Sequence, residues 1–285
     1  MRYFTFLLLL FGCTFSACNS NTTSTVNLNQ KFSGPTYLKV KGDFCEISVA
    51  VVGGTEITLD GTLEQLSNSK GYQLKYLVVE ETLKVWVDKP LATLGNARGS
   101  INLKVPANTR VKLESETGDI YVDGLSGEKV KVRTNSGDVF LNDLQTFISV
   151  KSASGDIEVS GQEGETKVKT GSGDLQLREI IGSLKAITTS GDINLDNFTG
   201  SIRMEAGSGE IKGKQLDFDG HSNVESYSGD IKFRLKAEPS SLHLLLTSKS
   251  GNITVGDSLV RNRFDNGSGD WQLQAHSNMG DINLR

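Results

Sequence analysis

The chain has 285 residues and a formal net charge of −4, and charged residues make up 22% of it. A chain of this length can bury a sizeable core in one elongated domain or in two small ones. The negative net charge argues against a nucleic-acid partner, which would need a basic face. Glycines outnumber prolines by 31 to 4, and aromatic residues reach only 7%. Because helical periodicity is also missing after residue 20, the sequence predicts an all-β protein with many tight turns.

Residues 1–17 are predicted to be a lipoprotein signal peptide. Arg2 is followed by an apolar run from Phe4 to Phe11, which is too short to span a bilayer as a helix. The segment FSAC that ends at Cys18 resembles the bacterial lipobox, although Phe15 stands where that pattern prefers leucine. Cys13 is a competing candidate with a shorter leader. A further alternative is an ordinary cleaved signal in which neither cysteine has a role.

Cys18 is therefore the predicted lipid anchor, because the lipobox cysteine is diacylated and becomes the first residue of the mature protein. Two or three acyl chains would hold the protein stably at a membrane. Asn19 follows the cysteine in place of aspartate, which by the lipoprotein sorting pattern favours an outer membrane in a cell that has one. Residues 18–32 are rich in Ser, Thr and Asn and are expected to form a flexible tether. The expected location is the cell envelope.

Residues 33–285 are predicted to form one domain. Within it, residues 33–105 hold strand-like stretches such as CEISVAVV and INLKVPA, separated by long irregular connections. Terminal repeats are often atypical because they cover a core, so this segment is expected to be an irregular β cap at the N-terminal end. Cys45 lies in one of these stretches and is expected to be buried as a small apolar residue. If Cys18 is acylated, Cys45 has no partner for an internal disulfide.

Residues 106–285 repeat a Ser-Gly-Asp-hydrophobic pattern at intervals close to 18 residues. Apolar residues stand two and four positions after the glycine and five before it, and they alternate with polar residues. This alternation predicts two short strands in each repeat, joined by the Ser-Gly-Asp turn. A fixed period of this kind is typical of stacked repeats. The expected fold is therefore a right-handed, single-stranded β-helix, or β-solenoid, with about 18 residues per coil.

Stacking would place the residues of this turn above one another in a structural ladder. The predicted ladder consists of Gly118, Asp119, Gly137, Asp138, Gly155, Asp156, Gly173, Asp174, Gly191, Asp192, Gly229, Asp230, Gly269 and Asp270. Recurrence of glycine at this position indicates a positive φ. The serine before each glycine is expected to hydrogen-bond to its copies in neighbouring coils. A looser corner, such as LDNFTG, would close each coil.

The stacked carboxylates of the ladder require some compensation. Carboxylates about 5 Å apart repel one another by roughly 1 kcal/mol per pair even in water. Hydrogen bonds from the amides of each carboxylate's own turn could offset this repulsion, and so could bound Ca²⁺. The period is double that of calcium-binding nonapeptide rolls, and Glu210 and Asn252 replace aspartate in two repeats. We therefore favour the turn and predict no metal site.

Catalytic and cofactor sites are not expected. His221, His243 and His276 are scattered and have no metal-ligand spacing. The sequence also lacks a Gly-x-Ser-x-Gly elbow, a phosphate-binding loop and a recognisable pair of glycosidase carboxylates. These observations predict a non-enzymatic protein without a cofactor.

The repeat Thr/Ser-x-Ser-Gly-Asp-Ile-x-Val, ending in MGDINLR, resembles a bacterial β-strand-repeat family of candidate adhesins. The resemblance is strong over residues 111–285 and loose over residues 33–105, and lipoprotein signals occur in that family. It implies an adhesin-like envelope lipoprotein whose rigid ladder surface binds a glycan or an envelope protein. The alternatives are a glycan-active enzyme, a lyase or hydrolase, on a β-helix scaffold, and an envelope-stress or regulatory lipoprotein.

Overall fold

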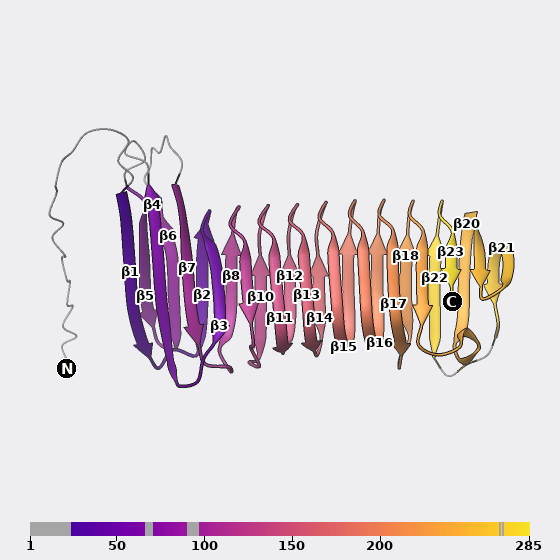
Figure 1. Ribbon diagram of the computed structural model, residues 1–285, viewed down its shortest axis with the longest axis horizontal. Coiled ribbons are helices and arrows are strands. Elements are labelled where there is room, and N and C mark those ends of the chain that lie inside the picture. Colours follow the sequence, from indigo (N-terminus) through magenta and orange to yellow (C-terminus); the bar gives the residue numbers. More distant parts are fainter. Residues whose placement is uncertain (1–23, 66–70, 90–96, 268, 270) are drawn as a thin grey trace.

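The computed structural model describes residues 24–65, 71–89, 97–267, 269 and 271–285 (Figure 1). These residues form 23 strands and one short 3₁₀ helix, η1 (Pro239–Ser241). The prediction of an all-β protein is confirmed.

Most strands belong to two ladders of parallel strands that enclose one apolar core. The first ladder runs in space through β6 (Thr82–Asp88), β2 (Tyr37–Asp43), β8 (Arg110–Ser115), β10 (Lys129–Arg133), β12 (Phe147–Lys151), β14 (Thr166–Lys169), the second halves of β15 (Leu175–Thr188) and β16 (Ile193–Ala206), β18 (Ser222–Ser226), β22 (Gln272–Ser277) and the first half of β20 (His243–Val255).

The second ladder is built in the same way on the other side of the core. It runs through β7 (Ala97–Val105), β3 (Glu46–Val51), β9 (Ile120–Asp123), β11 (Val139–Gln145), β13 (Ile157–Glu163), the first halves of β15 and β16, β17 (Ile211–Phe218), β19 (Ile231–Leu235), β23 (Ile282–Leu284) and the second half of β20. We call one first-ladder strand, its turn and the following second-ladder strand a rung.

The apolar positions of the repeat fill the space between the ladders. Ile157, Leu175, Ile193 and Ile211 are partners in successive strands of the second ladder, and all four are fully buried. Each such side chain contributes about 1.5–3 kcal/mol when it leaves water. The in-register stacking of the repeat therefore produces one continuous core.

Antiparallel strands complete both ends of the stack. At one end β1 (Ser24–Ser33) pairs with β4 (Glu56–Gln65), which pairs with β7, and β5 (Gln73–Val79) pairs with β6. At the other end β21 (Ser258–Asp265) pairs with β20 (Figure 1). The chain is thus in strand form from Ser24, where the sequence predicted a flexible tether up to residue 32, while residues 18–23 lie outside the described part.

The prediction of a single-stranded β-helix is wrong. Strands β2 and β3 precede β6 and β7 in the chain. In the stack, however, they lie between β6 and β7 on one side and β8 and β9 on the other. Strands β22 and β23 lie between the β18–β19 rung and β20, although β20 precedes them in the chain. The chain therefore does not wind continuously from one end to the other.

A closed ring of parallel pairings accompanies this rearrangement. Seven strands pair in the order β16, β17, β19, β23, β20, β22 and β18, and β18 returns to β16. The ring closes because β16 and β20 each run through both ladders. The period of the sequence shows which residues are equivalent, but it carries no information on the order in which the rungs stack.

Positive φ angles recur at the second corner of successive rungs in the middle of the stack rather than at the Ser-Gly-Asp turn. They recur at Asp143 (51°), Gly161 (66°), Glu179 (54°), Asn197 (55°) and Gln215 (53°). Among the described glycines of the predicted ladder, only Gly269 has a positive φ, of 122°. The expectation of a positive φ at the repeated glycine is therefore wrong for the stacked turns.

The turn glycine is required instead because successive rungs approach each other too closely for a side chain. A Cβ atom on Gly191 would lie 1.9 Å from the carbonyl oxygen of Gly173, and one on Gly209 would lie 1.8 Å from that of Gly191. The same clash, at 2.0–2.2 Å, recurs for Gly118, Gly137, Gly155 and Gly173. Real Cβ atoms do not come this close to backbone, so any side chain here pushes two rungs apart.

We predict that Gly191→Ala lowers the free energy of unfolding by about 3 kcal/mol, because the new methyl group overpacks against fixed backbone. Gly53→Ala is the matched control, since nothing lies within 4 Å of a Cβ at that position. The control should change stability by less than about 0.5 kcal/mol. Chemical denaturation of both variants measures the difference, and equal stabilities would contradict the close-approach explanation.

Candidate functional site

Hydroxyl groups brace most of the Ser-Gly-Asp turns, and those of Ser115, Thr170, Thr188, Ser248 and Ser277 also bond to a carbonyl of the neighbouring rung. The N–H of Gly191 donates to Thr188 Oγ1 at 3.0 Å, and the Thr188 hydroxyl donates to the carbonyl of Gly173 at 3.2 Å. The hydroxyls that accept from a turn glycine in this way are Ser115, Thr134, Ser152, Thr170, Thr188, Ser226, Ser248 and Ser277. Ala206 stands at the same position before Gly209.

The sequence suggested hydrogen bonds between copies of the serine immediately before the glycine, but the contacts between rungs come from a different hydroxyl. Ser154, Ser172 and Ser190 are exposed. The functional hydroxyl lies three residues before the glycine, where threonine or serine recurs in the sequence. The sequence shows this recurrence of serine and threonine, but it does not show that the hydroxyl points inward to the turn glycine.

The aspartates of the turn also bond to the next rung and not, as expected, to their own turn. The N–H of Asp192 donates to Asp174 Oδ1 at 2.8 Å, and the N–H of Glu210 donates to Asp192 Oδ1 at 2.8 Å. The carboxylates of Asp119, Asp138 and Asp156 accept in the same way. Each carboxylate therefore satisfies a backbone donor, which offsets the repulsion between neighbouring acids.

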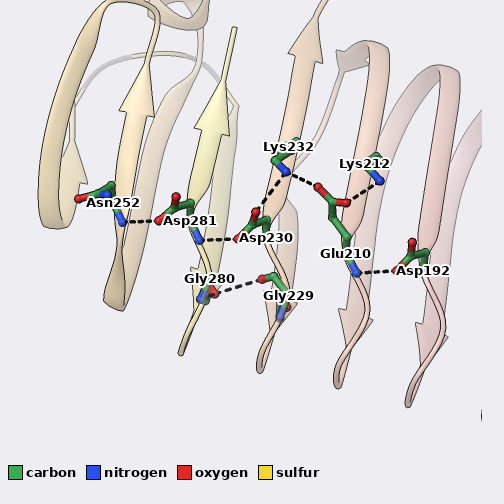
Figure 2. Close-up of polar contacts among 11 residues, drawn as sticks. Asp192, Glu210, Lys212, Gly229, Asp230, Lys232, Asn252, Gly280 and Asp281 are labelled. Carbon is green, nitrogen blue, oxygen red and sulfur yellow. Dashed lines mark hydrogen bonds and ion pairs between the residues drawn. The ribbon is translucent and has the colours of Figure 1, made fainter.

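The C-terminal part of this ladder follows the spatial order of the rungs (Figure 2). The N–H of Asp281 donates to Asp230 at 2.9 Å, and the N–H of Asn252 donates to Asp281 at 2.7 Å. Gly269 was predicted to belong to the ladder, but a Cβ there would contact His243 and Leu242 rather than another turn glycine. Its neighbour Asp270 lies outside the described residues. The last two turn glycines of the stack are therefore Gly280, which approaches Gly229, and Gly251, which approaches Gly280.

Glu210 uses its longer side chain differently. Its carboxylate forms ion pairs with Lys212 and Lys232, and Lys232 also contacts Asp230 at 3.1 Å (Figure 2). Partial burial raises the pKa of Glu210, but the hydrogen bonds from the two lysines outweigh it and lower the pKa overall. Its ion pairs therefore stabilise the fold at neutral pH and are lost as the pH falls through this lowered pKa.

Cys45 occupies the place of the turn glycine in the rung formed by β2 and β3. A Cβ on Gly118 would lie 2.0 Å from the carbonyl oxygen of Cys45, just as later turn glycines approach one another. The thiol is fully buried, as the sequence predicted. Burial, with a smaller contribution from Asp43, raises the pKa of the Cys45 thiol to about 12. Because the thiolate is the reactive form, this cysteine is inert at neutral pH.

The feature best suited to bind a ligand is a line of cations on the outer surface of the first ladder. The strand register places one outward side chain of each strand beside the next. We call this line the cationic row; it consists of Lys84, Lys39, Lys112, Lys131, Ser149, Lys167, Lys185 and Arg203. Neighbouring strands are about 4.8 Å apart, so the row is roughly 35 Å long.

Further cations flank the cationic row. Arg133, Lys151 and Lys169 lie two positions after the members of the row in β10, β12 and β14, and they are register partners of one another. Across the core the corresponding outward positions are mixed, with Glu158, Gln176, Asn194, Lys212 and Lys232 in register. The negative net charge of the chain therefore conceals one strongly positive face.

Few carboxylates neutralise this face. Glu114 pairs with Lys112, Glu165 with Lys167, and Glu205 with Arg203. For Lys39, Lys84, Lys131 and Lys185 no ion-pair partner occurs in the part of the chain that the structure describes. Like charges on neighbouring strands repel one another, and the long lysine side chains reduce this repulsion by spreading their ammonium groups apart. The cationic row thus costs folding energy, which an anionic ligand would relieve.

A surface hollow of about 450 Å³ lies along the cationic row where it crosses β2, β8 and β10. Tyr37, Lys39, Arg110, Lys112, Lys129 and Lys131 line it, together with Val111 and Glu128. The Tyr37 ring lies beneath Lys39 and Arg110, at 4.5 and 5.4 Å from its centroid, and the Phe147 ring lies beneath Lys129 and Lys167. Such contacts hold cations in place over an aromatic ring. Arg110 is ion-paired with Glu128 and Lys112 with Glu114, so Lys39, Lys129 and Lys131 are the cations of the hollow that can donate to an anion.

A nucleophile, a metal or a membrane-spanning helix would point to other functions. Among the described residues, no group of three or more His, Cys, Asp or Glu side chains is placed to hold a metal ion. In the same part of the chain, no helix has the length and apolar character needed to cross a membrane. The predicted lipid anchor Cys18 lies outside the described residues.

Comparison with known proteins identifies the family. The Toastrack DUF4097 family model matches residues 91–180 and 164–285. The chain belongs to this family. Toastrack is a β architecture distinct from a single-stranded β-helix, in agreement with the stacking order of the rungs. No curated protein matches the chain.

Several solved structures resemble the chain at low sequence identity. A candidate adhesin from Bacteroides fragilis is 10% identical, with 91% of this chain and 97% of that chain covered and a TM-score of 0.40. A candidate adhesin from Parabacteroides merdae is 12% identical, with 92% and 96% covered and a TM-score of 0.33. A candidate cell adhesion protein from Clostridium sporogenes is 12% identical, with 92% and 99% covered and a TM-score of 0.27.

We predict that Asp192→Asn leaves stability nearly unchanged, because the amide oxygen can still accept from the N–H of Glu210. Asp192→Ala removes the acceptor and should cost about 1 kcal/mol. Thermal unfolding is measured for both variants in calcium and in EDTA. A calcium-dependent loss of stability in Asp192→Asn would contradict the hydrogen-bonding role and indicate a calcium site.

Proposed function

We propose that the protein is a non-enzymatic, adhesin-like lipoprotein of the cell envelope that presents its cationic face to a glycan or a protein partner. The observation that carries this proposal is the cationic row, which aligns outward-facing charges along a rigid stack. Backbone hydrogen bonds between every pair of rungs fix the spacing of these charges. The backbone of such a surface is ordered before a ligand arrives, so binding has to order only the side chains.

Anchoring through Cys18 supports the envelope location. The apolar leader, the lipobox-like FSAC and the polar segment after it are all consistent with acylation of Cys18. β1 begins only a few residues later and lies at one end of the stack (Figure 1). An anchor there would leave both ladder surfaces open to partners.

One acidic residue of the cationic face, Glu114, is unsuited to act as the general acid of glycan hydrolysis. A general acid for glycosidic cleavage needs a raised carboxyl pKa. The Glu114 carboxylate lies beside the cationic row, and its hydrogen bond with Lys112 lowers its pKa despite partial burial. Lys41 lowers it further. Glu114 is thus an anion at neutral pH and cannot donate a proton to a leaving group.

The anchor is tested by substitution of each leader cysteine in cells. Cys18→Ala should move the protein from the detergent phase to a soluble or uncleaved form, and the control Cys13→Ala should be processed normally. Phase separation and mass spectrometry of the mature N-terminus measure this. Normal acylation of the Cys18→Ala variant together with failure of Cys13→Ala would assign the anchor to Cys13.

The binding role is tested with the full chain, purified in detergent, on arrays of glycans and envelope proteins. We expect saturable binding to at least one ligand, without change to that ligand. Release of product from a polysaccharide, lost on substitution of a single carboxylate, would contradict the proposal and indicate an enzyme.

A further inference from the structure

We propose that the cationic row binds a linear, carboxylate-rich polysaccharide, laid along the stack across β6, β2, β8, β10, β12, β14, β15 and β16. This inference rests on the proposed binding function and specifies the chemistry of its ligand. It is carried by the register of the row, by its unpaired lysines and by the hydroxyl groups beside it.

The geometry of the row matches an extended polymer with one charge per unit. Register pairs place Lys131, Ser149, Lys167 and Lys185 on consecutive strands, with one residue on each strand. The spacing of about 4.8 Å between strands is close to the length of one sugar ring. A polyuronate carries one carboxylate on each sugar, so its charges can follow the row from strand to strand.

Hydroxyl groups beside the cations suit a sugar backbone. Ser183 and Ser201 are register partners two residues before Lys185 and Arg203, and Ser149 lies within the row itself. A serine hydroxyl can both donate to and accept from a sugar hydroxyl. The hollow next to Lys39 and Lys131 adds a concave site large enough for part of a sugar chain.

The same features disfavour a duplex nucleic acid. Phosphates of a duplex follow helical paths, so a straight row could reach only a few of them at once. Stacking of unpaired bases needs free aromatic faces. The Tyr37 and Phe147 rings on this face are instead covered by Lys39, Lys129 and their neighbours.

A lipid surface is also a poorer match for this face. Interfacial binding combines cations with apolar side chains that enter the acyl region. The exposed large apolar residues of the described chain include Leu77, Val79, Ile181, Leu259 and Trp271, and among them only Ile181 lies on a strand of the row, in β15, four residues before Lys185. The cationic row therefore offers much charge and little exposed apolar surface.

The experiment measures binding of the full chain, held in phosphatidylcholine nanodiscs free of detergent, to polygalacturonate at several salt concentrations. Fully methyl-esterified polygalacturonate is the uncharged comparison, and duplex DNA and phosphatidylglycerol vesicles are the alternative polyanions. We expect binding to polygalacturonate that weakens with salt, little binding to the ester, and weaker binding to DNA and vesicles. The double variant Lys131→Gln/Lys185→Gln should bind about ten-fold more weakly, with a shallower salt dependence.

The matched control is Lys104→Gln/Lys214→Gln, which removes two exposed lysines from the second ladder. It should bind polygalacturonate as the parent does. The single variants Lys131→Gln and Lys185→Gln each give a smaller loss and serve if the double variant does not fold. Equal loss in the control and double variants, or tighter binding to DNA or vesicles than to polygalacturonate, would overturn the proposal.

Failure of this inference can be told apart from failure of the proposed function. Binding to a neutral glycan or to a protein on the arrays, with none to polygalacturonate, would overturn the polyuronate assignment and leave the binding role standing. Absence of any ligand on the arrays and of polygalacturonate binding would overturn both.

Discussion

The close approach of one turn to the next is the constraint on which the rest of the structure depends. At the Ser-Gly-Asp turns the α-carbon of one glycine lies against the carbonyl of the glycine in the neighbouring rung, with no room for a Cβ. That approach lets the Thr188 hydroxyl reach the Gly173 carbonyl and lets the Asp192 carboxylate reach the N–H of Glu210. A side chain at the glycine would separate the rungs and break both contacts at once.

Regular stacking also produces the candidate binding surface. Because every rung has the same register, residues one period apart lie side by side, and a lysine that recurs with the repeat becomes a row of lysines. On the inside of the same strands, the period aligns Val132, Val150, Val168 and Ala186 into the core. Core and surface are therefore two faces of one periodic pattern, and their spacing is set by the same backbone hydrogen bonds.

The ends of the stack obey different requirements from its middle. An open ladder end exposes unpaired backbone groups and invites pairing with another chain. Here antiparallel strands cover each end, and β21 carries Arg261, Arg263 and Asp265 on a strand that also contains the positive φ of Asn262. Strands β22 and β23 lie in space between the β18–β19 rung and β20, and they add one complete rung to the stack. In this rung the N–H of Gly280 donates to the Ser277 hydroxyl, and that hydroxyl donates to the carbonyl of Gly229.

The sequence by itself determined the all-β class, the two strands of each repeat, the buried position of Cys45 and the equivalence of residues one period apart, because alternation and period are local properties. It did not determine the order of the rungs, since equivalent repeats can stack in any order that buries their apolar faces. It placed the positive φ at the wrong corner, because recurrence of glycine does not distinguish a left-handed backbone from a close approach such as that of Gly191 to Gly173. Lys131 and Lys185 each recur one period from other lysines, but only the tertiary structure shows that they lie on one outward face of a chain whose net charge is negative. Net charge is a sum over the whole surface, whereas a binding face depends on where the strands place each charge.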